Sequence, residues 1–126
     1  MTFTSESGDS SKVSLNYSTS NNILNYTVHL NGAQYVNFNK ISITGSNSYA
    51  LSATAGTKHI RFNNCSFSQR SVSLNSTSNF IFKDNDFSYS SISVQSSDSV
   101  TIKNNEFNYR NISVYSSDII TIKNNI

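Results

Sequence analysis

Paired carboxylates are the first candidates for chemistry, because they can act as general acid and base or bind a metal ion. Asp86 and Glu106 are 20 residues apart, and Asp84 lies close to Asp86. Ca²⁺ needs several oxygen ligands, and these three residues would make only a loose site. Lys83 and Lys103 alternate with them, which is typical of a solvated, charge-balanced surface. We therefore favour the surface interpretation over a metal site.

The histidines and the remaining aspartates complete no catalytic pair. His29 and His59 lie in different parts of the pattern, and no carboxylate is spaced to orient either imidazole as a general base. Asp98 and Asp118 each end an "SSD" segment and are interpreted as turn residues. We expect no catalytic residue, no metal and no cofactor in this chain, and we favour a non-enzymatic role.

Tyrosine and arginine side chains indicate binding more than catalysis. Tyr89 and Tyr109 are 20 residues apart, and Arg70 and Arg110 lie beside them in the pattern. Sugar C–H groups pack on aromatic rings while arginine donates hydrogen bonds to hydroxyls, so these four residues are a candidate carbohydrate-binding face. The simpler interpretation is stacking that only stabilises the surface.

Lysines form a second candidate strip at the same spacing. Lys83, Lys103 and Lys123 would suit an anionic glycan. Stacked like charges reduce stability, although exposed side chains diverge and salt screens them, so the simpler interpretation is a solubilising surface. The net charge is only +2 and no lysine- or arginine-rich cluster occurs, which argues against a nucleic-acid partner.

The 20-residue interval is a property of the chain from about residue 58 onward. Five apolar columns keep it, and Val36 and Phe38 begin one more copy upstream with an offset of 24. A polar column, Cys65, Asn85, Asn105 and Asn125, lies between the apolar ones. The apolar columns are Ile60, Phe80, Val100 and Ile120; Phe62, Phe82, Ile102 and Ile122; Phe67, Phe87 and Phe107; Val72, Ile92 and Ile112; and Leu74, Val94 and Val114.

Within each repeat the local period is two. Segments such as "SVTI" and "NISV" alternate polar with apolar residues, which predicts short half-buried strands. A repeat of this length cannot enclose a core alone and must stack on its neighbours. We predict an all-β, right-handed parallel β-helix with about 20–24 residues per coil. A leucine-rich horseshoe is the alternative, but a second alternating strand at Ile112 and Val114 does not fit its convex side.

The polar column has a structural interpretation. After each "TI"-type strand the chain must bend, and asparagine tolerates left-handed backbone angles while bonding locally. We predict that Asn85, Asn105 and Asn125 occupy this bend and that their stacked amides hydrogen-bond between coils. Cys65 interrupts the column and is predicted to be a small, buried and unreactive thiol.

The repeat "VTIKNNEF" resembles that of right-handed parallel β-helix proteins of the pectin-lyase-like superfamily, over residues 35–126. The upstream "TFTSESGDSSKVSLNYS" resembles the entry segment of large secreted β-helix surface proteins of Bacteroidota. The resemblance implies irregular entry coils over residues 1–34, regular coils over 35–126, an Asn ladder at one bend and an extracellular or cell-surface location. Many superfamily members are polysaccharide lyases, hydrolases or epimerases, but the NTD, DD and HG signatures of β-helix galacturonases are missing here.

Composition supports a folded chain. Aromatic residues make up 12% and charged residues 13%, and disordered chains are poor in aromatics. The N-terminus is polar and no apolar run reaches membrane-spanning length, so we expect no membrane insertion. One cysteine allows no internal disulfide.

We expect a non-enzymatic structural or adhesive piece of a larger extracellular protein, able to contact carbohydrate. The alternative is a fragment of a β-helix carbohydrate-active enzyme whose catalytic residues lie elsewhere. We also expect self-association through an uncapped C-terminal coil, because an unpaired strand edge is a template for further pairing.

Overall fold

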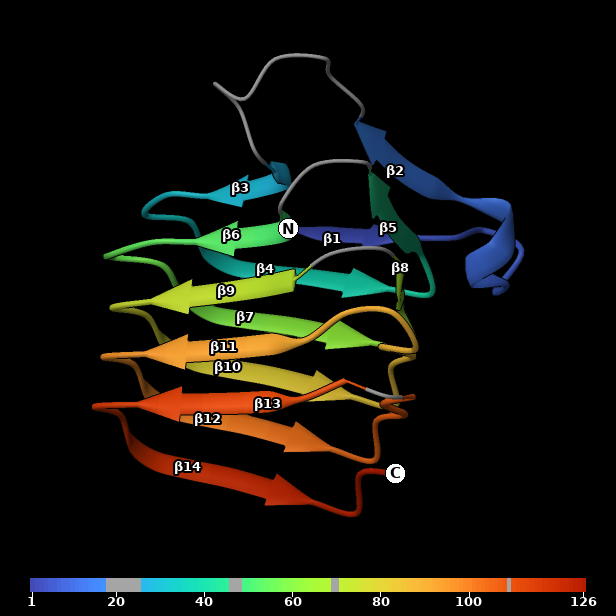
Figure 1. Cartoon of the computed structure of the whole chain (residues 1–126). Helices are drawn as coiled ribbons and strands as arrows, with labels where there is room; N and C mark the ends of the chain where they lie inside the picture. The colour runs from blue at the N-terminus through green and yellow to red at the C-terminus, as the bar shows by residue number, and fades with distance from the viewer. Residues whose placement is uncertain (18–25, 46–48, 69–70, 109) are drawn as a thin grey trace.

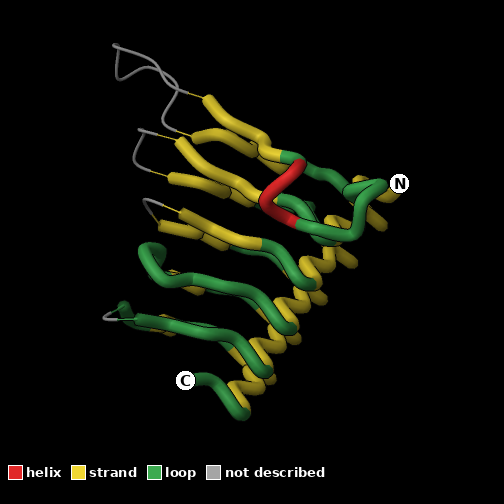
Figure 2. The backbone as a smooth tube through the Cα atoms, turned by 90° about the vertical axis from the view of Figure 1, so that its right-hand side faces the viewer, coloured by secondary structure: helices red, strands yellow, loops and turns green. Residues whose placement is uncertain are grey.

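The chain forms a parallel β-solenoid of about five turns (Figure 1). The computed structural model describes residues 1–17, 26–45, 49–68, 71–108 and 110–126. Within these ranges the only helix is a short 3₁₀ turn, η1 (Ser10–Lys12), and the rest of the regular structure is strand. This confirms the predicted all-β solenoid. Figure 2 shows the turns stacked one on another along a single axis.

Three parallel sheets make up the sides of the solenoid. The longest sheet has six strands, in the order β1 (Thr2–Thr4), β4 (Gln34–Asn39), β7 (Lys58–Asn63), β10 (Ser78–Lys83), β12 (Asp98–Lys103) and β14 (Asp118–Lys123). A five-stranded sheet runs β13 (Ile112–Tyr115), β11 (Ile92–Gln95), β9 (Ser71–Asn75), β6 (Tyr49–Ala53) and β3 (Tyr26–Leu30). The third sheet holds β2 (Ser14–Tyr17), β5 (Ser42–Gly45) and β8 (Ser66–Ser68), and isolated bridges continue it.

The strand register follows the sequence repeat. Phe62 pairs with Phe82, and Val100 pairs with Ile120, so residues 20 apart lie side by side in neighbouring turns. Upstream, Val36 pairs with Ile60. Because side chains of a strand alternate between its two faces, this register carries each apolar column inward along the whole stack.

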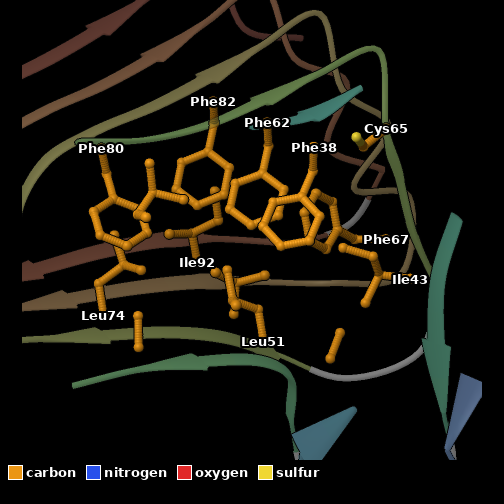
Figure 3. Packing of buried hydrophobic residues seen from close by; sticks show 14 of the residues in the cluster. Phe38, Ile43, Leu51, Phe62, Cys65, Phe67, Leu74, Phe80, Phe82 and Ile92 are labelled. Atoms are coloured by element: carbon orange, nitrogen blue, oxygen red, sulfur yellow. The ribbon is translucent and has the colours of Figure 1, made fainter. Parts of the chain in front are cut away.

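Stacked phenylalanines fill much of the interior (Figure 3). The ring of Phe62 stacks on Phe38 and on Phe82, with centroids 4.6 and 5.2 Å apart. Phe67 stacks on Phe87 at 4.6 Å, and Phe82 meets the edge of Phe87 at 5.7 Å. Burying one such side chain contributes about 1.5–3 kcal/mol, and each well-placed aromatic pair adds about 0.5–1.5 kcal/mol. The core is thus a continuous ladder and holds the turns in register.

The bends depart from the sequence prediction in two respects. Left-handed backbone occurs at Asn64, Asp84, Asn104 and Asn124, with φ of 52–56°, one residue before each member of the Cys65/Asn85/Asn105/Asn125 column. The prediction that the column itself takes the left-handed backbone is therefore wrong. Asp98 and Asp118 begin strands β12 and β14, and the left-handed turn residues are Ser96 and Ser116 instead.

Candidate functional site

A groove of about 280 Å³ crosses the outward face of the six-stranded sheet. It spans strands β7, β10, β12 and β14, whose inward residues form the core. We call it the sheet groove. Its two walls are the outward columns His59, Asn79, Ser99 and Ile119, and Arg61, Ile81, Thr101 and Thr121.

One wall of the sheet groove has unusual backbone. In the six-stranded sheet, the second residue of each strand from β4 onward is left-handed, with φ of 52–58°: Tyr35, which lies beyond the groove lining, and the wall residues His59, Asn79, Ser99 and Ile119. A non-glycine residue in this region costs about 1–2 kcal/mol, and a β-branched one such as Ile119 is least suited to it. The bend residues Asn104 and Ser96 have the same left-handed backbone, so it is a regular feature of the turns and does not by itself mark a site.

An aromatic stack lies at the N-terminal end of the sheet groove. The rings of Tyr35 and His59 are parallel within 8°, with centroids 4.5 Å apart. Tyr35 is 63% exposed, so the stack presents an apolar surface to solvent beside polar groove walls. His59 packs on the tyrosine ring and has no carboxylate among the groove-lining residues to orient it.

Positive charge lies on the Arg61 side of the sheet groove, whereas exposed Asp98 and Asp118, the first residues of β12 and β14, precede the other wall. Exposed Arg61 lies in one wall, and the next outward column along the strands contains Lys83, Lys103 and Lys123, which pair in register. The groove lining contains no carboxylate. Within the described ranges the single ion pair joins Lys83 to Asp84, with Nζ and Oδ2 3.4 Å apart.

The predicted tyrosine–arginine face is described only in part. Tyr89 lies in a turn and is 61% exposed, and Arg110 is also exposed. The residue 20 positions before Arg110 is Ser90, which is fully buried and donates its Oγ hydrogen to the Phe67 carbonyl at 3.3 Å. Tyr109 and Arg70 lie outside the described residues, so this face stays a prediction.

The acidic residues bond to their own neighbours. Asp86 accepts hydrogen bonds from the N–H of Ser88, at 2.8 Å, and from its hydroxyl. Glu106 accepts from the Asn108 amide at 2.9 Å. Within the described ranges no three His, Cys, Asp or Glu side chains are grouped to hold a metal ion.

The asparagine column is a hydrogen-bonded ladder between turns. Asn105 Oδ1 accepts from the N–H and the side-chain amide of Asn85, at 2.9 and 3.0 Å. The Asn105 amide in turn donates to Asn125 Oδ1 and to the Phe82 carbonyl, both at 3.0 Å. At the upper end, the N–H of Cys65 donates to Asn85 Oδ1 at 2.8 Å. The column therefore joins consecutive bends and offers no exposed reactive group.

Cys65 is enclosed at the head of this ladder. The residue is 2% exposed, and its thiol donates to the Asn63 carbonyl, with Sγ and O 3.4 Å apart. Burial raises the pKa of the Cys65 thiol, because desolvation disfavours the thiolate. The reactive form of cysteine is the thiolate, so this environment suits a structural residue.

A second ladder was missed from the sequence. Thr77 donates its N–H to Ser97 Oγ at 3.2 Å, and Ser97 donates its N–H to Ser117 Oγ at 3.0 Å, at the bend that precedes the six-stranded sheet. The signal was present, since these residues recur every 20 positions. It was hidden because serine and threonine are common throughout the chain.

The sheet groove was also missed from the sequence. The left-handed wall consists of a histidine, an asparagine, a serine and an isoleucine. These side chains share no chemical character, so no column stood out. The only available signal was the interval itself.

Comparison with known proteins identifies no relative, so the proposed function is argued from the geometry of the chain and from the resemblance of its repeat. No protein-family model, no curated protein and no solved structure matches this chain. None of the helical structure in the described ranges is long and apolar enough to cross a membrane.

Proposed function

We propose that the chain is a non-enzymatic structural or adhesive segment of an extracellular or cell-surface protein, and that its sheet groove contacts glycan. The observation that carries the proposal is the groove itself, which repeats polar side chains over four consecutive turns. A groove that continues over four turns suits a chain-like ligand, because each turn contributes at least one polar or charged side chain along it: Arg61, Asn79, Thr101 and Thr121. From the "VTIKNNEF" repeat we propose an origin in the pectin-lyase-like superfamily, and from the upstream "TFTSESGDSSKVSLNYS" an origin among the large β-helix surface proteins of Bacteroidota.

Two features of the groove support glycan contact. Asn79, Ser99, Thr101 and Thr121 supply neutral hydrogen-bond donors and acceptors, which match sugar hydroxyls. The exposed Tyr35 ring supplies an apolar surface of the kind on which sugar C–H groups pack.

The groove lining supports binding over hydrolysis. Glycosidases generally flank the scissile bond with two carboxylates, and the sheet groove contains none. His59 is stacked on Tyr35 and lacks a carboxylate partner among the lining residues. These walls can contact a sugar chain, but they lack the carboxylate pair that most glycosidases use to hydrolyse it.

A glycan array tests the proposal. Arg61→Ala and Thr101→Val change the groove walls at outward positions with ordinary backbone, and each should lower glycan binding severalfold. Gln95→Ala, an exposed change on the five-stranded sheet, is the matched control and should bind like the unmodified chain. Loss of binding in Tyr89→Ala alone would instead favour the tyrosine–arginine face.

Two outcomes would contradict the proposal. One is a folded sample, verified by circular dichroism, that binds no glycan. The other is depolymerisation of a uronate polymer, which would favour the fragment of a carbohydrate-active enzyme.

We also propose that the polypeptide of residues 1–126 associates through its last turn. Among the described residues, strands β13 and β14 have a pairing partner on one side only. Val114 and Ile122 are 37% and 49% exposed, whereas Val94 and Ile102, in the same columns, are fully buried. A further turn of the solenoid would cover the edge formed by β13 and β14. In a purified sample of residues 1–126, a second copy of the polypeptide can pair with this edge instead.

A further inference from the structure

We propose that the ligand of the sheet groove is a linear acidic polysaccharide that lies along the solenoid axis, with its negative groups facing the lysine column. This inference rests on the proposed glycan contact and specifies the class of glycan. The lysine column is Lys83, Lys103 and Lys123.

The register sets the direction of the ligand. Lys83 pairs with Lys103, and Lys103 pairs with Lys123, so the three side chains leave the same face of successive strands. Neighbouring strands are about 4.8 Å apart, which places the ammonium groups in a row along the axis. The groove walls follow the same direction, because they too contribute one residue per turn. A ligand that follows the groove therefore passes the lysines in sequence.

The carboxylates expected to balance the lysines form an ion pair with the column only at Lys83, since Asp86 and Glu106 accept hydrogen bonds from Ser88 and Asn108 instead. Lys83 has Asp84 at 3.4 Å, but no described carboxylate lies within 4.0 Å of Lys103 or Lys123. Like charges stacked directly opposite each other in a sheet are destabilising. A surface needed only for solubility avoids this cost by mixing both signs of charge. The unmatched row is therefore better explained by an external anion that binds to several lysines at once.

The groove walls distinguish a sugar chain from other polyanions. Single-stranded nucleic acid binds to successive aromatic rings on which its bases stack, whereas among the described residues that line or adjoin the sheet groove the aromatic rings are Tyr35 and His59, at one end. Apart from His59, the wall residues are Arg61, which carries the one permanent charge of the lining, and six uncharged residues: Asn79, Ile81, Ser99, Thr101, Ile119 and Thr121. Hydroxyl and amide groups beside a row of ammonium groups match a polymer that carries both hydroxyls and negative charge.

Salt dependence provides the central experiment. Binding of polygalacturonate, of dextran sulfate and of neutral dextran would be measured by calorimetry at about 50 and 300 mM NaCl. We expect at least one acidic polymer to bind, neutral dextran to bind much more weakly, and the higher salt to reduce affinity about tenfold or more. Polygalacturonate and dextran sulfate distinguish a uronate carboxylate from a sulfate ester as the anionic group.

Charge-matched variants locate the binding. Lys103→Gln should lower affinity for the acidic polymer about threefold or more, and Lys103→Glu should lower it further. Lys12→Gln removes the same charge from the 3₁₀ turn, away from the six-stranded sheet, and should bind like the unmodified chain. All variants change exposed or half-exposed side chains, and circular dichroism verifies that each is folded.

The failures are distinguishable. Equal and salt-insensitive binding of neutral dextran would overturn the acidic ligand while leaving glycan contact in place. An equal loss in Lys12→Gln and Lys103→Gln would show attraction by net charge alone and would overturn the site. Tighter binding of single-stranded DNA than of either acidic polymer would replace polysaccharide by nucleic acid. No binding of any polysaccharide would overturn the proposed function itself.

Discussion

Replacing Asn105 by alanine should destabilise the protein far more than an exposed Asn→Ala change does. The Asn105 side chain is 1% exposed and makes four hydrogen bonds, two as acceptor and two as donor. Alanine removes all four. The N–H of Asn85 then loses its partner in a buried site, whereas the Asn85 side-chain amide keeps the Phe62 carbonyl.

The magnitude follows from these contacts. An orphaned buried N–H costs about 1–3 kcal/mol, and each remaining lost bond costs about 0.5–1.5 kcal/mol net. The free energy of unfolding should therefore fall by about 4 kcal/mol, a large part of the roughly 5–15 kcal/mol of a typical domain. For a chain of 126 residues this corresponds to a decrease in Tm of about 15 °C.

Urea unfolding followed by far-UV circular dichroism measures the effect, since the chain contains no tryptophan. Asn108→Ala is the matched control. Asn108 is exposed, and its amide donates to Ser88 and Glu106 at the surface, so its loss should cost about 0.5 kcal/mol or less. A loss below about 1 kcal/mol for Asn105→Ala, with an unchanged m-value, would refute an energetic role for the ladder.

Asn105→Asp separates hydrogen bonding from packing. The aspartate keeps the shape, but its carboxylate cannot donate to the Phe82 carbonyl or to Asn125. Burial and the two facing acceptors oppose the charged carboxylate, while the two Asn85 donors favour it; because the site is fully buried, we expect the folded pKa to lie above the unfolded value of about 3.9. The protonated form therefore supplies stability at low pH that is lost as pH rises through the folded pKa. The deficit relative to the unmodified chain should be largest at neutral pH and should narrow near about pH 4.

Three further predictions concern the core, the thiol and the edge. Phe82→Ala should cost about 3–5 kcal/mol, whereas Phe82→Ile, which supplies the residue type of the next turn but loses the ring contacts, should cost about 1.5–3 kcal/mol; equal losses in urea unfolding would contradict the ladder packing. Cys65→Asn should be neutral or stabilising by up to about 1 kcal/mol, and native Cys65 should react slowly with thiol reagents because burial raises its pKa, an expectation that fails if labelling is as fast as in urea. Light scattering over about a hundredfold dilution should show association of the 1–126 polypeptide that Ile122→Lys abolishes, and a folded monomer at every concentration would disprove it.

Sequence periodicity was enough to predict the inward side of the solenoid. Phe62 and Phe82 recur at the interval that the register requires, and a closed stack must bury the same face in every turn. The bend was harder to predict, because "KNN" offers two adjacent asparagines that both tolerate left-handed backbone. Hydrogen bonding decides between them: Asn105 must direct its amide along the axis, so Asn104 takes the left-handed angle.

Packing constrains the outward residues less than the inward ones, so an outward residue type that repeats from turn to turn indicates another cause. Packing requires an apolar residue at each inward position, so an inward column repeats regardless of the function of the protein. Outward positions are free of that requirement, and the groove wall changes from Arg61 to Ile81 and then to Thr101.

The lysine column is an outward column that does repeat. Half of the six lysines in the chain lie in it, although its own repulsion opposes such a placement. Duplication of a turn would copy every residue, but the outward neighbours Ile81 and Thr101 have diverged while Lys83, Lys103 and Lys123 are the same. The fold does not require this identity. A ligand with repeated negative charge along the axis would require it, and the lysine variants test that explanation directly.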